Sequence, residues 1–263
     1  MADRNLFELQ QVRFAYGETE VLRGITVAFP PARFYGIVGP NGCGKTTLLD
    51  LLIGSRRPLE GSVRLDGQEV SGCSRRTLAQ RLALVPQDYG IRFAFTVEEI
   101  VLMGRHPYLP RFGSPGARDF QLVEEAMAEI GIVHLKARCI NELSGGEQQR
   151  VVVARALAQQ TPVLLLDEAT SSLDIQYTLE IFQALRQRVR TRGHTVIAVM
   201  HNLNLAAAYC DEVLLMKGGR IVQAGPTAEV LNPAGIREVF NVESAVYFDE
   251  FSRSLQVSFR YGE

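Results

Sequence analysis

A glycine-rich segment that ends in lysine and threonine is the clearest candidate for chemistry in this chain. It extends from Gly39 to Thr46 and matches the pattern GxxxxGK(S/T). Glycines in such a loop let backbone N–H groups face phosphate oxygens at the positive start of a helix. Lys45 would reach the outer phosphates of a nucleotide, and the hydroxyl of Thr46 would bind Mg²⁺. The predicted phosphate-binding residues are Gly39, Pro40, Asn41, Gly42, Cys43, Gly44, Lys45, Thr46 and Thr47. The alternative is a chance glycine turn.

Two carboxylates at the end of an apolar run are the second candidate. Asp167 and Glu168 directly follow the predicted strand Val163–Leu166. A strand-end aspartate in nucleotide hydrolases holds Mg²⁺, usually through water. The neighbouring side chain points the other way along a strand, so Glu168 can polarise the attacking water as a general base. The alternative is that both acids only cap the next helix, but their pairing with the glycine-rich loop favours the catalytic roles.

A third motif lies between these two. Ser144 is placed to cap a helix at its N-terminus, with Glu147 three residues later as its capping-box partner. On the residues alone this is a well-capped helix. The segment Leu143–Arg150, LSGGEQQR, is similar to the signature of ABC ATPases and stands in that family's order, between the loop and the carboxylates. The resemblance extends from Tyr16 to about Gly225.

The resemblance implies that two identical subunits bind ATP between them, head to tail. Ser144, Gly145, Gly146 and Glu147 of one copy would then bind the ATP held on the other copy, so that a homodimer encloses two ATP molecules. Hydrolysis would follow in-line attack of a water on the γ-phosphate.

Further single residues match family positions, each with an ordinary structural alternative. Tyr16 resembles the aromatic residue that stacks on adenine, although it could be a surface tyrosine in a turn. Gln87 resembles the glutamine that senses Mg²⁺ and the γ-phosphate, and Asp174 belongs to a segment, Ser172–Asp174, that resembles the family's loop across the dimer interface. His201 resembles the histidine that contacts the γ-phosphate, although a lone histidine at a strand end is usually structural. The implied catalytic residues are therefore Glu168, His201, Gln87 and Lys45, and the implied metal ligands are Thr46, Gln87 and Asp167.

One position departs from the pattern. Ala169 stands where most relatives have proline, and we expect a less rigid turn there with the chemistry intact.

The segment Phe95–Tyr108 is where transporter ATPases of this family receive the coupling helix of a membrane partner, and we expect its apolar residues to line a groove. Its end, Gly104–Tyr108, together with Cys43, resembles the ATPases of importers for iron–siderophore, haem and cobalamin. The alternative is an ordinary helix ended by Pro107. The importer reading implies two integral-membrane permease subunits, a substrate-binding protein acting through them, and a peripheral position at the cytoplasmic face of the inner membrane.

The predicted elements place these motifs on an α/β fold: a P-loop NTPase (RecA-like) core with an antiparallel β subdomain and an inserted α-helical subdomain. Residues 1–263 are expected to form a single domain, with the core in 1–87 and 160–235, the helical subdomain in 88–159 and a tail in 236–263. Helices are predicted over much of 117–158. The predicted strands are Leu6–Phe14, Val21–Phe29, Phe34–Val38, Ser62–Leu65, Leu82–Val85, Val163–Leu166, Thr195–Val199, Val213–Met216, Ala245–Phe248 and Leu255–Phe259.

Composition narrows the alternatives. The chain has 28 Lys+Arg against 29 Asp+Glu and no block of like charge, which disfavours nucleic-acid binding. It has no apolar run of about 18 residues, as a membrane span requires, and no signal-peptide pattern, so we expect a cytoplasmic chain. The four cysteines are expected to be free thiols, and the helix start beside Cys43 is expected to lower its pKa, so that alkylation blocks nucleotide.

Three other functions stay open at this point. A soluble ABC ATPase of DNA repair, translation or cluster assembly often has two ATPase units or a long coiled coil, and neither is evident. A scaffold that no longer hydrolyses ATP is expected to have lost Glu168 or His201, and both are retained. An exporter subunit fits the same motifs.

Overall fold

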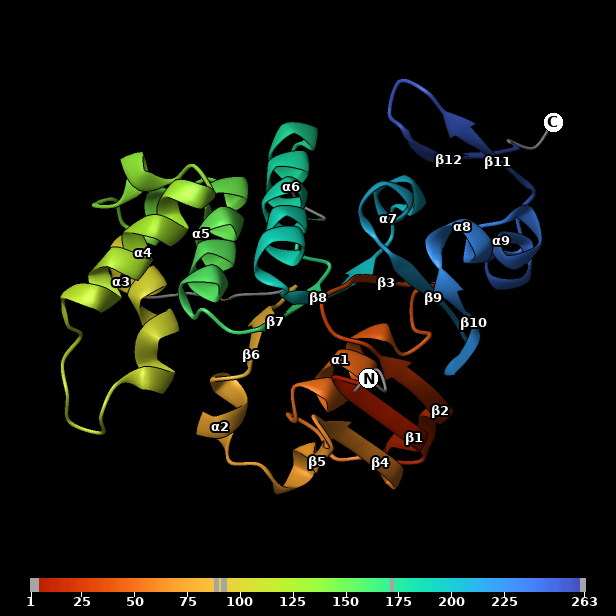
Figure 1. Ribbon diagram of the computed structural model, residues 1–263, viewed down its shortest axis with the longest axis horizontal. Helices are drawn as coiled ribbons and strands as arrows, with labels where there is room; N and C mark the ends of the chain where they lie inside the picture. The colour runs from red at the N-terminus through yellow and green to blue at the C-terminus, as the bar shows by residue number, and fades with distance from the viewer. Residues whose placement is uncertain (1–4, 88–89, 91–93, 171–172, 261–263) are drawn as a thin grey trace. The chain divides into compact units, whose positions relative to one another are not determined.

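The computed structural model of the chain describes residues 5–87, 90, 94–170 and 173–260, and it falls into two compact units (Figure 1). The first unit contains Met1–Cys73 and Thr195–Glu263, and the second contains Ser74–His194. The functional subdivision predicted above, with breaks after residues 87 and 159, stays a prediction.

An antiparallel sheet begins the first unit, as predicted. Its order is β2-β1-β4-β5. Alternate residues of β1, among them Phe7 and Leu9, are buried, and the ring of Phe7 meets Phe29 edge to face at 6.4 Å between centroids. The strands joined by a tight turn at Gly17 are therefore half-buried, as alternation of apolar and polar residues requires. The bounds are β1 Phe7–Tyr16, β2 Thr19–Phe29, β4 Glu60–Leu65 and β5 Gln68–Glu69, followed by the 3-10 turn η1 Val70–Gly72.

Parallel strands form the second sheet of this unit. β3 pairs in parallel with β8 and with β9, while β10 pairs antiparallel to β9. Every residue of β3 and β8 is buried. Helix α7 packs on both strands, α8 packs on β9 and β10, and α1 lies on the opposite side of the sheet (Figure 1). Continuous apolar runs are typical of strands covered on both faces. The bounds are β3 Phe34–Val38, β8 Thr195–Met200, β9 Glu212–Lys217, β10 Arg220–Pro226, α1 Lys45–Leu52, α7 Leu203–Tyr209 and α8 Thr227–Val230.

The last part of the chain adds a helix and a hairpin to the first unit. The helix α9 (Pro233–Phe240) begins at Asn232, whose side chain accepts the N–H of Gly235 at 2.9 Å. The hairpin of β11 (Ser244–Asp249) and β12 (Ser254–Phe259) packs on α7. There the amide oxygen of Asn204 accepts the N–H of Val257 at 2.7 Å. The two late strands predicted from sequence are confirmed.

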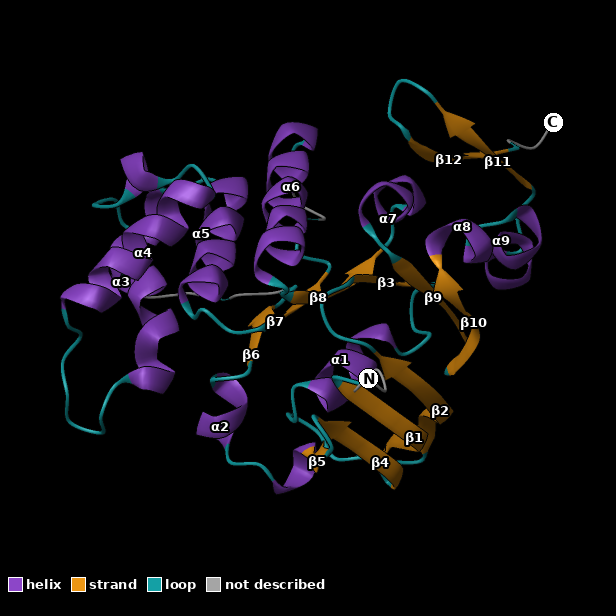
Figure 2. Ribbon diagram, viewed as in Figure 1, coloured by secondary structure: helices purple, strands orange, loops and turns teal. Residues whose placement is uncertain are grey.

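The second unit is mainly helical (Figure 2). Helices α3 and α4 pack on α5, and the strands β6 and β7 pair in parallel. Helices were predicted over much of 117–158, and this region contains α4, α5 and two short 3-10 turns. The bounds are α2 Arg75–Ala79, β6 Leu82–Val85, α3 Val97–Leu102, η2 Met103–Tyr108, α4 Ala117–Glu129, η3 Val133–Leu135, η4 Ile140–Glu142, α5 Gly145–Ala158, β7 Val163–Asp167 and α6 Ile175–Arg192.

Within the described ranges, none of the helices combines the length and apolarity that a bilayer crossing requires.

Candidate active site

The glycine-rich loop joins β3 to α1 in the first unit, the strand–loop–helix context that phosphate binding requires. Lys45 is 5% exposed, and its ammonium group donates to the carbonyl oxygens of Gly39 at 2.8 Å and Pro40 at 3.1 Å. The ammonium group of Lys45 is therefore held against the backbone of its own loop. A phosphate can replace these two neutral acceptors with charged oxygens, which form stronger hydrogen bonds.

Glycine is required at two positions of this loop. A Cβ on Gly39 would lie 2.2 Å from the carbonyl oxygen of Met216, a backbone atom of β9. Gly44, at the N-terminus of α1, has φ +101°, which disfavours any residue with a Cβ. The loop also rests on the turn after β9, because the N–H of Gly219 donates to the carbonyl of Cys43 at 3.2 Å. The contacts with β9 and with the turn after it therefore fix the conformation of the loop.

The Cys43 thiol corrects an expectation. Its pKa was predicted to be lowered by the start of α1, but burial raises the pKa of this thiol despite the opposing effects of Lys45 and of backbone N–H groups. The residue is 3% exposed, and the thiolate loses more by desolvation than it gains from the charges around it. The prediction was wrong because the sequence does not show how deeply a variable loop position is buried.

The other predicted residues of the first unit lie at element ends. Thr46 is exposed on the first turn of α1, whereas Thr47 is buried. Tyr16 ends β1 and is 43% exposed, with the guanidinium of Arg56 4.9 Å from the centre of its ring. A guanidinium at this distance is attracted to one face of the aromatic ring. His201 is exposed directly after β8. Their roles in binding stay predictions.

Two candidate catalytic side chains meet in the second unit. The amide nitrogen of Gln87, just after β6, donates to a carboxylate oxygen of Glu168 at 2.6 Å. Asp167 ends the fully buried strand β7 and is 7% exposed. Glu168 follows with φ +50°, a conformation that costs energy in a residue with a Cβ and that often marks functional sites. The sequence predicted each residue, but not the hydrogen bond between Gln87 and Glu168.

The signature segment forms the helix start predicted for it. The Ser144 hydroxyl accepts the N–H of Glu147 at 3.3 Å, and the Glu147 carboxylate accepts the N–H of Ser144 at 2.8 Å, so the capping box is confirmed. The Ser144 N–H, followed by the Ser144 hydroxyl, lowers the pKa of Glu147. Gly145 and Gly146 form the first turn of α5. Asp174 precedes α6, and the predicted Ser172 lies outside the described residues.

An apolar groove of about 550 Å³ lies in the second unit. It confirms the expectation that apolar residues of Phe95–Tyr108 line a groove. Met103, which is 43% exposed, contributes to its surface. The lining residues are Ala79, Glu99, Leu102, Met103, His106, Pro107, Leu109, Pro115 and Gln159.

Comparison with known proteins gives the family. Residues 22–171, more than half of the chain, match the family model described as ABC transporter. The chain belongs to the ABC transporter family. The ATP-binding relatives in this family are ATPases. The fold is accordingly the mixed α/β fold of an ABC ATPase, with a P-loop sheet and an antiparallel β subdomain, as predicted.

Several curated relatives are similar over most of this chain. A cobalamin import ATP-binding protein of Halobacterium salinarum is 41% identical over 240 residues, covering 91% of this chain, which spans only 60% of that relative. A hemin import ATP-binding protein of Pseudomonas entomophila is 40% identical over 246 residues, covering 92% of this chain and 94% of the relative. A ferric enterobactin transport ATP-binding protein of Escherichia coli is 35% identical, covering 91% and 89%.

Solved structures agree with this assignment. A metal-chelate type ABC transporter in an inward-facing conformation has a TM-score of 0.85 at 26% identity, covering 98% of both chains. A dimeric ATP-binding cassette in a post-hydrolysis state, bound to ADP and phosphate, has a TM-score of 0.75 at 26% identity, covering 84% of this chain and 98% of that one.

Proposed function

We propose that this chain is the ATP-hydrolysing subunit of an importer for a metal chelate of the haem, ferric siderophore or cobalamin type. The import direction and the cargo class are supported by the relatives, whose names concern hemin, ferric enterobactin and cobalamin. The proposal that the chain hydrolyses ATP rests mainly on one observation: Gln87 donates a hydrogen bond to Glu168, which has a positive φ. This hydrogen bond holds the proposed general base in a defined position next to a second polar side chain.

The proposed mechanism assigns one task to each residue. Lys45 binds the outer phosphates in place of its present carbonyl partners. Glu168 aligns the attacking water and accepts its proton, while His201 contacts the γ-phosphate. Ser144 and the first N–H groups of α5 in a second copy bind the same phosphate. Tyr16 stacks on the adenine, and Asp174 lies where the two copies meet.

A divalent cation fits the oxygen donors among these residues. The Thr46 hydroxyl, the Asp167 carboxylate and the Gln87 amide oxygen are the hard ligands that Mg²⁺ prefers. When bound, the ion neutralises charge on the transferring phosphoryl group. These three residues would hold the ion.

We further propose a homodimer bound to two permease subunits at the cytoplasmic face of the inner membrane, with a substrate-binding protein acting through the permease. The dimer is supported by the similar cassette whose structure is dimeric. The apolar groove at Met103 is the proposed seat for a coupling helix of the permease, because a helix of a partner can bury its apolar face there. Nucleic acid is not a proposed partner.

Uptake in cells tests this function. The source organism without the gene for this chain is given radiolabelled haem, ferric siderophore or cobalamin, and is complemented with wild type or variants. We expect uptake of one chelate class to return with wild type but not with Glu168→Gln or with Met103→Asp, which places a charge in the groove. Phe251→Asp is the matched control, because Phe251 is 98% exposed and lies outside the groove. Unchanged uptake of all three chelates in the deletion strain would favour an exporter or a soluble ATPase.

A further inference from the structure

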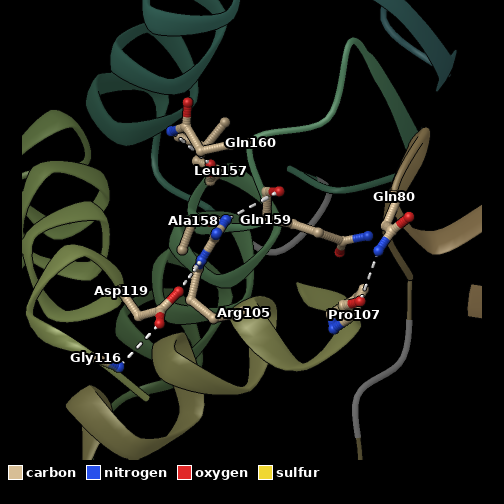
Figure 3. A network of polar contacts seen from close by, with 9 residues as sticks. All are labelled: Gln80, Arg105, Pro107, Gly116, Asp119, Leu157, Ala158, Gln159 and Gln160. Carbon is tan, nitrogen blue, oxygen red and sulfur yellow. Dashed lines mark hydrogen bonds and ion pairs between the residues drawn. The ribbon is translucent and has the colours of Figure 1, made fainter. Parts of the chain in front are cut away.

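A buried arginine belongs to the same 3-10 turn as several residues that line the groove. Arg105 belongs to η2, and only 9% of its side chain is exposed. Its guanidinium extends from η2 to the C-terminal end of α5 (Figure 3). There it donates to the carbonyl oxygens of Ala158 at 2.9 Å and Gln159 at 3.3 Å. Helix C-termini are negative, so a cation at these unpaired carbonyls is stabilised.

The same guanidinium joins two more segments. Its Nε donates to the Asp119 carboxylate at 2.9 Å, and the other Asp119 oxygen accepts the N–H of Gly116 at 3.0 Å, at the start of α4. The Gly116 N–H, followed by Arg105, lowers the pKa of Asp119, so this carboxylate stays charged. The guanidinium also lies 4.2 Å from the ring centre of Tyr108. One side chain therefore connects η2, α4 and α5.

Glutamine side chains extend this connection to β6. Gln159 donates to the carbonyl oxygens of Ala79 and Leu82, the latter at 2.8 Å. Gln80 donates to the carbonyl of Pro107 at 2.9 Å (Figure 3). Backbone contact is also close, since a Cβ on Gly104 would lie 2.3 Å from the carbonyl oxygen of Arg155. The walls of the groove are thus fixed to the end of α5 and to the strand that leads to Gln87.

We propose that Arg105 is a positioning residue that makes the groove and the helix α5 move as one body. A displacement of the groove then reaches Ser144 at the opposite end of α5 and, through β6, the Gln87–Glu168 pair. The reverse path lets ATP bound at Ser144 alter the groove. This inference deepens the proposed function and rests on it. Within the described residues, Arg105 contacts Asp119, Ala158, Gln159 and Tyr108, and none of these four is assigned to ATP, so it acts through α5.

Hydrogen exchange on the purified full-length chain tests this coupling. In the Glu168→Gln background, ATP with Mg²⁺ is expected to protect amides at the start of α5 and also amides of Met103–Tyr108. With Arg105→Gln added, the protection at the start of α5 and the ATP-dependent pairing remain, but the ATP-induced change at Met103–Tyr108 is lost. Arg105→Lys, which keeps the charge without the planar fork, is expected to restore part of that change. It also serves as the test variant if Arg105→Gln does not fold.

Arg76→Gln is the matched control. Arg76 is exposed and donates to the carbonyl of Leu109, a residue that lines the groove, at 2.8 Å. In the described part of the chain, no hydrogen bond of Arg76 to α5 is found. This variant should keep the full ATP-induced change. The inference is overturned if Arg105→Gln, or Arg105→Lys in its place, keeps the change in full, if Arg76→Gln loses it equally, or if the groove of Glu168→Gln does not respond although the chain pairs. Failure of Glu168→Gln to pair with ATP would instead refute the proposed function.

Discussion

The ion pair between Arg188 and Glu129 gives a prediction whose size follows from the structure. Arg188 on α6 donates through Nε at 2.7 Å and through Nη2 at 2.6 Å to the two oxygens of Glu129, the last residue of α4. The exposed fractions of the two side chains are 4% and 23%. Arg188→Ala leaves a partly buried carboxylate without its partner. Removing one member of a fully buried pair costs about 3–5 kcal/mol.

The expected loss here is smaller, because water still reaches Glu129. We expect the free energy of unfolding to fall by about 2–3 kcal/mol, which corresponds to a Tm lower by about 5–10 °C in a chain of this size. Urea and thermal unfolding followed by circular dichroism measure it. Arg190→Ala is the control, since Arg190 is exposed on the same helix and should change stability by less than about 0.5 kcal/mol.

A double-mutant cycle separates the ion pair from lost packing. Arg188→Ala, Glu129→Ala and the double variant should show a coupling energy of about 1 kcal/mol or more. Strictly additive effects, or an Arg188→Ala variant as stable as Arg190→Ala, would refute the reasoning.

Three further predictions concern single side chains. Gly39→Ala should abolish nucleotide binding, because its Cβ would lie 2.2 Å from the carbonyl oxygen of Met216; Gly72→Ala, which meets no atom within 4 Å, should bind normally in the same titration. Cys43 should react slowly with iodoacetamide at neutral pH, because burial raises its pKa; modification as fast as that of a free thiol would contradict this. The pKa of His194 is lowered by burial and by Arg188 and Arg192. The unfolded chain therefore binds the extra proton first, and stability should fall as pH drops through about 6.5. His194→Gln should flatten this dependence in urea titrations at several pH values.

Local sequence patterns predicted much of the fold. The strands β3 and β6 have the predicted bounds, because short apolar runs between turn residues identify buried strands. The capping box at Ser144 was also predictable, since it depends on residues three apart. By contrast, β10 and α9 were missed. The turn at Gly218-Gly219 before β10 and the Asn232-Pro233 pair before α9 were usable signals.

Contacts between distant segments were not predictable in this way. Gln87 and Glu168 are 81 residues apart, and only the folded chain shows that they share a hydrogen bond. The sequence marked Arg105 as part of a family-like motif, but its buried position against the end of α5 depends on the packing of α5 on η2. The predicted lowering of the Cys43 pKa was wrong for the same reason, because burial, which raises this pKa, is a property of the folded chain.

Mixing two inactive variants tests the central claim, that two copies complete each other's ATP sites, most directly. Lys45→Ala removes the phosphate-binding lysine and keeps the signature, whereas Ser144→Arg blocks the signature and keeps Lys45. Single-turnover ATP hydrolysis is measured for each variant alone and after their co-expression. The account predicts that neither variant hydrolyses ATP alone and that the mixture recovers activity, because a mixed dimer contains one intact site. A mixture as inactive as its components, or full activity of Ser144→Arg alone, would contradict the account.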